Sequence, residues 1–245
     1  MTIGLFIPCY VNQFYPNAAK ATLQLLKKLG VDVVYPTKQT CCGQPMANSG
    51  FEHLTAGCNE LFIENFSGFD YIVAPSASCV LHVKEHLHSE KNEERAAVIR
   101  TKVYELVEFL TDILKVEKLQ AVFPHKVGLH HSCHGLRGLC LSQMSELNAP
   151  SFSKPQRLLN MVQGLEQISL DRPDECCGFG GTFCIAEEAV SVKMGKDRVA
   201  DHTKNGAEYI TSSDLSCLMH LEGILHRNKS NVKVVHIAEI LNATA

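Results

Sequence analysis

The chain has 245 residues, of which 45% are hydrophobic and 20% are charged, and its net charge is −3 at pH 7. This composition is that of an ordinary globular protein with a sizeable core, and it excludes an intrinsically disordered chain. The nearly balanced charge and the lack of any Lys/Arg run argue against nucleic acid as a partner.

The amino-terminal segment MTIGLFIPCY has neither a basic stretch nor a small-residue cleavage site, so it predicts no signal peptide. No run of about 18 apolar residues occurs, so we expect no transmembrane segment. These two features together predict a cytoplasmic protein.

The hydrophobic pattern of the first half predicts strands that alternate with helices. An apolar strand at 2–7 precedes a helix over about 16–29, with Pro16 suited to its first position and Gly30 just past its end. The elements expected next are a strand at 31–35, a helix leading from the Cys41-Cys42-Gly43 loop to about 66, a strand at 70–74, a helix from about 79, a strand at 101–104 and a helix to about 115.

The second half predicts the same order of elements. Its strands are expected near 126–131, 166–170, 207–211 and 232–235. Apolar strands separated by helices are typical of parallel sheets covered by helices. The predicted fold class is therefore α/β, with two pseudo-repeated halves, each a mostly parallel sheet covered by helices.

Four segments of the first half recur in the same order in the second, as expected of an internal duplication. IGLFIPC at 3–9 matches VGLHHSC at 127–133, Cys-Cys-Gly occurs at 41–43 and 176–178, FDYIVAPSASCVLH at 69–82 aligns with AEYITSSDLSCLMH at 207–220, and ELVEFL at 105–110 matches HIAEIL at 236–241. We place the boundary between residues 115 and 125, which gives one half at 1–120 and another at 121–245.

The chain has eleven cysteines, and eight of them follow predicted strands at matching places in the two halves. These are Cys9, Cys41, Cys42 and Cys79 in the first half and Cys133, Cys176, Cys177 and Cys217 in the second. The carboxyl ends of parallel strands share one sheet edge, so we expect the cysteines to gather there, between the halves. Four thiolates can hold a cubane 4Fe-4S cluster, or a zinc ion in a tetrahedral site. We predict one or two 4Fe-4S clusters that serve electron transfer.

Gly43 and Gly178 follow the two vicinal cysteine pairs. Glycine permits a sharp turn whose amides can hydrogen-bond cluster sulfur. Helix amino termini directly after these loops would also stabilise the negative charge of a thiolate-bound cluster.

Three histidines are candidates for hydrogen-bonding around the cysteines: His82, His134 and His220. His82 and His220 each follow the last cysteine of a half by three residues, and solvent-facing helix positions are the alternative. His134 belongs to the segment His-His-Ser-Cys-His at 130–134, where direct metal ligation is the less favoured interpretation.

Several other residues carry weaker signals. Cys58, Cys140 and Cys184 lack repeat partners, so they are interpreted as core residues, with Cys184 the best candidate for a further role. Arg137, Lys193 and Arg198 have the charge to pair with a carboxylate, but solvated surface charge is the favoured interpretation. GFGGT at 178–182 is only a weak match to a phosphate-binding loop.

The duplicated pattern Cys…Cys-Cys-Gly…Cys resembles the CCG cysteine-rich family, and the resemblance covers nearly the whole chain. This family includes the cysteine-rich subunit of heterodisulfide reductase and the iron–sulfur subunits of glycolate oxidase and anaerobic glycerol-3-phosphate dehydrogenase. The segments IPCYVNQFYP, CCGQP, PSASC, CCGFGGTF and SSDLSCLMH are most similar to those of its lactate-utilization A group.

The resemblance implies an oxidoreductase subunit, inactive alone, that helps to oxidise L-lactate to pyruvate. It implies two partner subunits, one with ferredoxin-like clusters, and any peripheral position at the inner membrane would come through these partners. Some relatives hold zinc in one of the two halves, so the halves need not carry the same metal.

Ser76 and Asp214 mark a departure from one branch of the family. The cysteine-rich subunit of heterodisulfide reductase has a further cysteine at these places and a non-cubane cluster, so Ser76 and Asp214 favour four-cysteine sites. The alternatives that stay open are a structural zinc or assembly module, a glycolate- or heterodisulfide-type subunit, and a thiol–disulfide enzyme acting through a vicinal pair.

Overall fold

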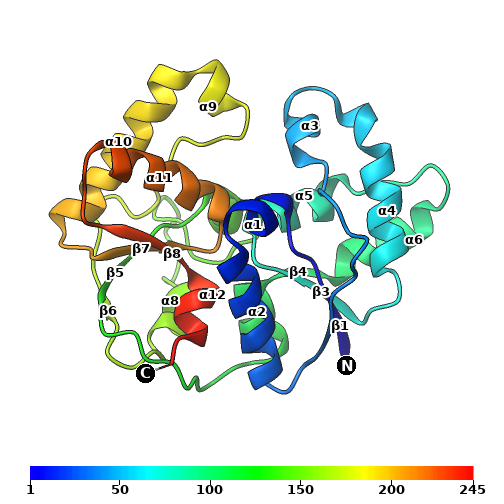
Figure 1. Ribbon diagram of the computed structural model, residues 1–245, viewed down its shortest axis with the longest axis horizontal. Helices are drawn as coiled ribbons and strands as arrows, with labels where there is room; N and C mark the ends of the chain where they lie inside the picture. Colours follow the sequence, from blue (N-terminus) through cyan, green and yellow to red (C-terminus); the bar gives the residue numbers. More distant parts are fainter. Residues whose placement is uncertain (245) are drawn as a thin grey trace.

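The computed structural model describes residues 1–244, which form two four-stranded parallel sheets, one in each half of the chain (Figure 1). The first sheet has the order β2-β1-β3-β4 and contains β1 (Thr2–Leu5), β2 (Asp32–Val34), β3 (Tyr71–Ala74) and β4 (Val103–Glu105). The second has the order β6-β5-β7-β8 and contains β5 (Lys126–Leu129), β6 (Glu166–Gln167), β7 (Tyr209–Ser212) and β8 (Lys233–His236). The predicted α/β class with two parallel sheets is confirmed.

Helices cover both sheets. In the first half these are α1 (Cys9–Phe14), α2 (Pro16–Lys28), α3 (Gln44–Asn48), the 3₁₀ turn η1 (Glu52–Thr55), α4 (Ala56–Phe66), α5 (Ala77–His86), α6 (Glu93–Lys102), α7 (Leu106–Glu108) and the π-helical turn η2 (Phe109–Ile113). In the second half they are the π-helical turn η3 (His134–Gly138), α8 (Lys154–Leu159), α9 (Phe183–Ala186), α10 (Glu188–Lys204), α11 (Leu215–Arg227) and α12 (Ile237–Asn242). Within residues 1–244, no helix combines the length and hydropathy needed to span a bilayer.

Three helical segments differ from the sequence prediction. The helix expected to run from the Cys-Cys-Gly loop to residue 66 is broken into α3, η1 and α4, because Gly50 has a φ of 83° and ends the first of them. Helix α6 occupies the region before β4, so this strand begins at Val103 rather than 101. Helix α5 begins at Ala77 because the Ser76 hydroxyl accepts from the Cys79 amide, which places Cys79 in the first turn.

The final strand of each sheet ends in a capping box, which is the three-dimensional counterpart of the ELVEFL and HIAEIL repeat. In the first half, the Glu105 carboxylate accepts from the Val107 amide at 2.6 Å. In the second, His236 Nδ1 accepts from the Ala238 amide at 3.2 Å, and Glu239 accepts from the His236 amide at 3.1 Å. The repeat therefore preserves a local hydrogen-bond pattern as well as an apolar one.

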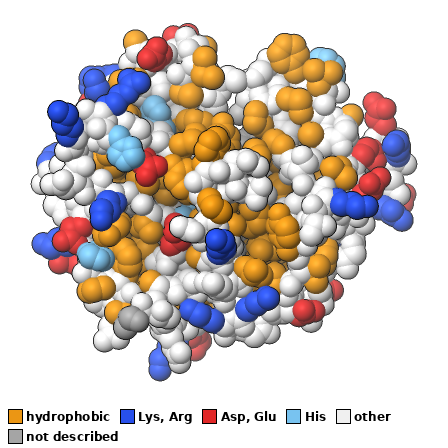
Figure 2. Space-filling model, in the orientation of Figure 1, with side chains coloured by type: hydrophobic (Ala, Val, Ile, Leu, Met, Phe, Trp, Pro, Cys, Tyr) orange, Lys and Arg blue, Asp and Glu red, His pale blue; other side chains and the backbone are white. Residues whose placement is uncertain are grey.

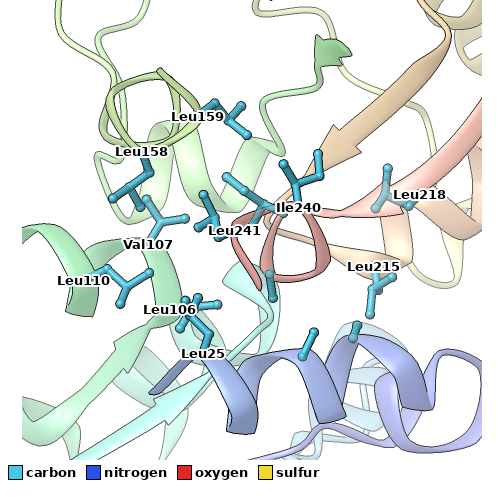
Figure 3. Packing of buried hydrophobic residues seen from close by; sticks show 14 of the residues in the cluster. Leu25, Leu106, Val107, Leu110, Leu158, Leu159, Leu215, Leu218, Ile240 and Leu241 are labelled. Carbon is cyan, nitrogen blue, oxygen red and sulfur yellow. The ribbon is translucent and has the colours of Figure 1, made fainter. Parts of the chain in front are cut away.

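One hydrophobic core runs through both halves. Helix α12, at the end of the chain, lies beside α2 of the first half (Figure 1). Leu25 of α2 and Leu106 of α7 lie near Ile240 and Leu241 of α12, and all four are buried (Figure 3). Each such leucine contributes about 2 kcal/mol of transfer free energy. The division into folding units at 1–120 and 121–245 stays a prediction.

A buried carboxylate also joins the halves. Asp214 is 1% exposed and caps the amino terminus of α11, where its Oδ1 accepts from the Ser216 amide at 3.1 Å. Its Oδ2 accepts from the Ser78 amide in α5 of the other half, at 2.7 Å. The first turns of α5 and α11 carry Cys79 and Cys217, so one side chain ties together two helix starts that bear cysteines.

We expect Asp214→Ala to lower the free energy of unfolding by about 3 kcal/mol, because two buried amides lose a charged acceptor. Asp214→Asn keeps one acceptor oxygen and should cost less. Asn92→Ala is the matched control, since it removes an exposed helix cap that has only a local bond to Arg95 and should cost about 1 kcal/mol. Urea denaturation measures all three. Equal losses for Asp214→Ala and Asn92→Ala would contradict the bridging role.

Stability should also fall in acid because of His236. This imidazole is fully buried, and burial lowers its pKa from 6.5 to about 4. The unfolded chain binds the proton more readily, so the contribution of His236 is complete above about pH 6.5 and is lost as the pH falls toward 4, by about 3 kcal/mol.

His236→Asn retains a capping acceptor but does not titrate, so its unfolding free energy should fall less between pH 7 and 4 in urea titrations. The same change at the exposed His226 is the control. Parallel profiles for wild type and His236→Asn would show that this imidazole is not responsible.

Candidate metal centre

The four predicted cysteines of the first half meet at the carboxyl ends of its strands. Cys9 begins α1 beyond β1, Cys41 and Cys42 lie in the loop after β2, and Cys79 lies in the first turn of α5. The sulfurs of Cys9 and Cys41 are 3.7 Å apart. Cys42 contacts the side chains of both Cys41 and Cys79. These four side chains are called the first quartet below.

The second half repeats this arrangement in the second quartet, Cys133, Cys176, Cys177 and Cys217. Cys176 contacts the side chains of Cys133 and Cys177, and Cys177 contacts Cys217. All eight cysteines are free thiols, so no disulfide among the described residues closes either quartet. The structure thus brings together the residues that the repeat singled out, and their role as ligands stays a prediction.

The first cysteine of each vicinal pair is the one most readily ionised. The Gly43 amide donates to Cys41 Sγ and the Gly178 amide to Cys176 Sγ, each at 3.4 Å. Hydrogen bonds from Cys42 and Cys9 lower the pKa of Cys41, whereas the bond to Cys41, together with burial, raises the pKa of Cys9. The two glycines have φ values of 91° and 88°, a left-handed conformation in which other residues are strained.

A helix follows only the first vicinal pair directly. Gly43 is the residue before α3, whereas α9 begins at Phe183, after the glycine-rich loop that follows Gly178. The expectation of a helix amino terminus at both loops is therefore right for the first half and wrong for the second. In the second half the Phe179 amide instead donates to Cys177 Sγ at 3.4 Å.

Both quartets open onto one cavity of about 420 Å³ between the halves. Its cysteine lining comprises Cys9, Cys42, Cys79, Cys133, Cys176, Cys177 and Cys217. Within residues 1–244, its lining includes no Lys, Arg, Asp or Glu side chain. Figure 2 shows the same distribution, with hydrophobic side chains gathered between the halves and charged ones mainly around the periphery. The cavity is therefore a thiol-rich and largely apolar space.

The three predicted histidines lie near the quartets but in different surroundings. His82 is 5% exposed, so a solvent-facing position is excluded, and burial lowers its pKa to about 4. Its ring stacks on His86 with centroids 5.0 Å apart, beside the loop of the vicinal pair. His134 lines the cavity. The Nε2 atom of His220 lies 3.3 Å from the Ser191 carbonyl oxygen, so its hydrogen-bond partner is the backbone of α10 rather than a cysteine.

Arg198 is not the surface charge that the sequence predicted, because its side chain is fully buried. Its Nε donates to His130 Nδ1 at 3.2 Å, and its Nη1 lies 3.3 Å from Asp201 Oδ2. One ring nitrogen of His130 and the sulfurs of Cys177 and Cys217 all lie within 4.8 Å of one another. A local signal existed for this burial, since residues 191, 195, 198 and 202 fall on one face of α10.

The remaining candidates lie at or near the surface. Arg137 and Lys193 are exposed and pair with Glu146 and Asp197, as solvated charges do. Cys140 is exposed, so its interpretation as a core residue is wrong. Its φ of 51° places it in a turn after η3 rather than on a packed face.

The other two unmatched cysteines are only partly buried. Cys58 lies in α4, and Cys184 donates from its thiol to the Gly181 carbonyl at 3.1 Å. Gly180, Gly181 and Thr182 of the glycine-rich segment line the cavity beside the second quartet. This segment is therefore part of the thiol site, as its position after Cys177 implies.

The donor sets fit soft metals. Thiolates are the ligands of iron–sulfur clusters and of many zinc sites, whereas hard cations require oxygen ligands. The 3.7 Å separation of the Cys9 and Cys41 sulfurs is close to the edge of about 3.8 Å expected for a tetrahedron with zinc–sulfur bonds of about 2.3 Å. A cluster uses the same four thiolates, one for each iron. The residues present therefore fit either kind of centre.

Comparison with known proteins gives the same picture of two repeats. The sequence profile described as "CCG: Cysteine-rich domain" matches residues 3–84 and 127–222. Lactate utilization protein A of Bacillus subtilis is 38% identical over 247 residues, which cover 99% of this chain and 100% of that protein. The protein of the same name from Shouchella clausii is 39% identical, covering 99% of each chain.

A solved structure supports the fold. A hypothetical protein from Helicobacter pylori matches 98% of this chain with a TM-score of 0.62 and 14% identity. The match covers 48% of that protein, so this chain spans about half of its length. The duplicated profile and the full-length relatives together show that the chain belongs to the CCG cysteine-rich family, among the lactate utilization protein A relatives.

Proposed function

We propose that this protein is an iron–sulfur electron-transfer subunit of a multi-subunit complex that oxidises L-lactate to pyruvate. The observation that carries the proposal is that two thiol quartets open onto one cavity that has no charged lining among the described residues. Full-length relatives named lactate utilization protein A supply the substrate. In this role the eight cysteines hold 4Fe-4S clusters, one or two per chain, and each cluster supplies one-electron transfer when bound.

The cavity is suited to electrons rather than to lactate itself. Oxidation of lactate to pyruvate releases two electrons and two protons, and it needs a group that holds the carboxylate and a base that takes the hydroxyl proton. Among residues 1–244 the cavity lining has no Arg or Lys to hold the carboxylate, and His134 is its only imidazole. We therefore assign lactate binding, and with it proton removal, to a partner subunit.

What this chain's residues do is bind and tune. The Gly43 and Gly178 amides donate to the sulfurs of Cys41 and Cys176, and such bonds favour the more negative, reduced form of a centre. Cys42 and Cys79 in the first quartet, and Cys177 and Cys217 in the second, are buried, so part of each quartet is shielded from water. The glycine amides and the buried cysteines thus influence the reduction potential of each centre, and none of them forms or breaks a bond of lactate.

The mouth of the cavity offers a surface for a partner. Ile185 lines the cavity yet is 80% exposed. Phe14 in α1 is 64% exposed, and its ring centroid lies 5.9 Å from that of Tyr10, which lines the cavity. Exposed apolar side chains next to a functional cavity are typical of protein contact surfaces. We propose that one of two partner subunits, carrying ferredoxin-like clusters, docks here. The complex would be cytoplasmic and would meet the inner membrane only through those partners.

A structural or assembly role with zinc is the second candidate. The near-tetrahedral separation of the Cys9 and Cys41 sulfurs favours it, and the halves can differ in the metal that they hold. A thiol–disulfide enzyme is less favoured, because Cys42 and Cys177, one member of each vicinal pair, are buried. A glycolate- or heterodisulfide-type subunit would use the same cysteines and differ only in the substrate that reduces or oxidises its complex.

Protein purified without oxygen should contain about four to eight irons per chain with matching acid-labile sulfide. With one cluster in each half, Cys42→Ser and Cys177→Ser should each remove about half of the iron, because each loses one thiolate of a quartet. Cys140→Ser is the matched control, since this cysteine is exposed and should not affect metal content. Zinc without sulfide in the wild type would contradict the electron-transfer proposal and support the zinc module.

Removal of the metal should loosen the ligand loops without unfolding the protein. The ligands come from separate loops. Of the loops that carry the Cys-Cys-Gly segments, only Cys177 is a buried member of the hydrophobic core shared by the two halves, so this core does not depend on the metal. We expect faster hydrogen exchange at 39–50 and 174–186 in the metal-free protein, with the amides of β1 and β5 unchanged. Equal exchange in these loops with and without metal would show that they are ordered independently of it.

A further inference from the structure

The two halves differ at one buried position directly before each quartet. Phe6 donates its amide to the Val73 carbonyl at 2.9 Å, and His130 donates its amide to the Thr211 carbonyl at 2.7 Å. These bonds link the ends of β1 and β3 in one sheet and of β5 and β7 in the other. Phe6 and His130 therefore occupy the same place in the repeat, three residues before the first cysteine of each quartet.

The neighbours of this position differ in the same way. Phe6 packs edge-to-face against Phe62 and Phe66, with ring centroids 5.0 and 5.8 Å away. His130 instead contacts Arg198, and His202 lies one helical turn beyond.

The strand glycines support the correspondence of these helices. A methyl group on Gly4 would meet Phe69 and Phe66, and one on Gly128 would meet His202. Phe62 and Phe66 in α4 are thus matched by Arg198 and His202 in α10, with the same spacing of four residues. An aromatic cluster in the first half is replaced by a buried polar one in the second.

Arg198 determines which nitrogen of His130 carries the proton. A guanidinium can only donate, so its Nε–H to His130 Nδ1 contact at 3.2 Å makes Nδ1 an acceptor. An Nδ1 atom that accepts a hydrogen bond carries no proton, so the ring is not an imidazolium. A neutral imidazole that accepts at Nδ1 has its proton on Nε2.

The Nε2 atom is the free end of this arrangement. It is buried and has no partner among residues 1–244, while a ring nitrogen of His130 lies within 4.8 Å of the sulfurs of Cys177 and Cys217. A protonated Nε2 has no lone pair for a metal. It can donate a hydrogen bond to a thiolate, which is a different role from ligation.

Arg198 also brings a buried positive charge to the second quartet. Its side chain is fully buried, its Nη2 has no partner in the described part of the chain, and Asp201 is its only carboxylate partner there, at 3.3 Å. Asp201 also accepts from the Asp171 and Arg172 amides, each at 3.1 Å, so its negative charge is shared with that loop. The first half has phenylalanine at the matching position, which provides neither a charge nor a donor.

We propose that His130 and Arg198 are positioning residues that make the second quartet the electron-accepting site of the pair. His130 donates from Nε2 to the Cys177 and Cys217 thiolates, and Arg198 holds it in that tautomer. This inference rests on the proposed function. With a cluster in each quartet, an electron shared by the two sites would rest on the second and leave the first oxidised. The His130 N–H donor and the buried Arg198 guanidinium would stabilise the added negative charge without any proton transfer.

The first test is a redox titration, followed by electron paramagnetic resonance, of protein reconstituted with iron and sulfide. Arg198→Met keeps an unbranched stem but removes the charge and the donor. It should lower the potential of one site by about 59 mV or more, a tenfold change in its reduction equilibrium, and leave the other site unchanged. Phe62→Met is the matched control at the corresponding first-half position and should leave the second-quartet potential unaltered. Equal potentials for wild type and Arg198→Met would overturn the proposal.

The second test uses wild-type protein and needs no iron. In zinc-loaded protein labelled with ¹⁵N-histidine, the His130 resonance, identified by its loss in His130→Phe, should show a protonated Nε2 and a bare Nδ1. A protonated Nδ1 would contradict the proposed tautomer, and coupling of Nε2 to cadmium in cadmium-loaded protein would make His130 a ligand. Either result would overturn the proposal. Because this test uses wild-type protein, it still decides the question if Arg198→Met does not fold. Wild type without iron or sulfide would sink the electron-transfer function, while this readout would still decide the role of His130.

Discussion

The Asp214 carboxylate is a buried acceptor that helix starts from both halves share, next to the cysteines of the site. Two helix starts point at this carboxylate, those of α5 and α11, and their partial positive charges would repel one another without it. Since Cys79 and Cys217 lie in those first turns, the bridge fixes how the two quartets face one cavity. Asp214, which the sequence marked as a departure from one branch of the family, thus joins the two halves here.

Duplication explains most of the remaining architecture. Parallel strands bring loops from distant parts of the chain to one edge, so a repeat of the strand order repeats the convergence of four thiols. The details that a thiol site needs are repeated as well, including Gly43 and Gly178, whose amides reach the sulfurs of Cys41 and Cys176. Differences between the halves are therefore informative, because they mark positions where the same scaffold supports different local electrostatics.

The sequence was enough to predict the strands and the convergence of the cysteines, because apolar runs and a repeated order are local signals that parallel pairing converts into position. The burial of Arg198 was not predicted, although residue 198 shares one face of α10 with the buried residues 191, 195 and 202. A buried cation depends on its partners. Asp201 lies three residues further along α10, but His130 comes from the end of β5, and no local pattern of α10 shows that His130 will be present. The break between α3 and α4 at Gly50 and the exposure of Cys140 were missed for a related reason, since backbone conformation at single turn residues decides both.

The apolar lining of the cavity has two consequences that support each other. A lactate carboxylate placed there would find no Lys or Arg among the described lining residues, so the cavity favours passage of electrons over binding of the acid. A lining with no charged side chain also screens a buried charge less than water does, which strengthens the effect of such a charge on a neighbouring redox centre. Arg198 is that charge, 0% exposed and connected to the second quartet through His130. A site that rejects the substrate's charge is therefore also one in which a single arginine can decide where the electron rests.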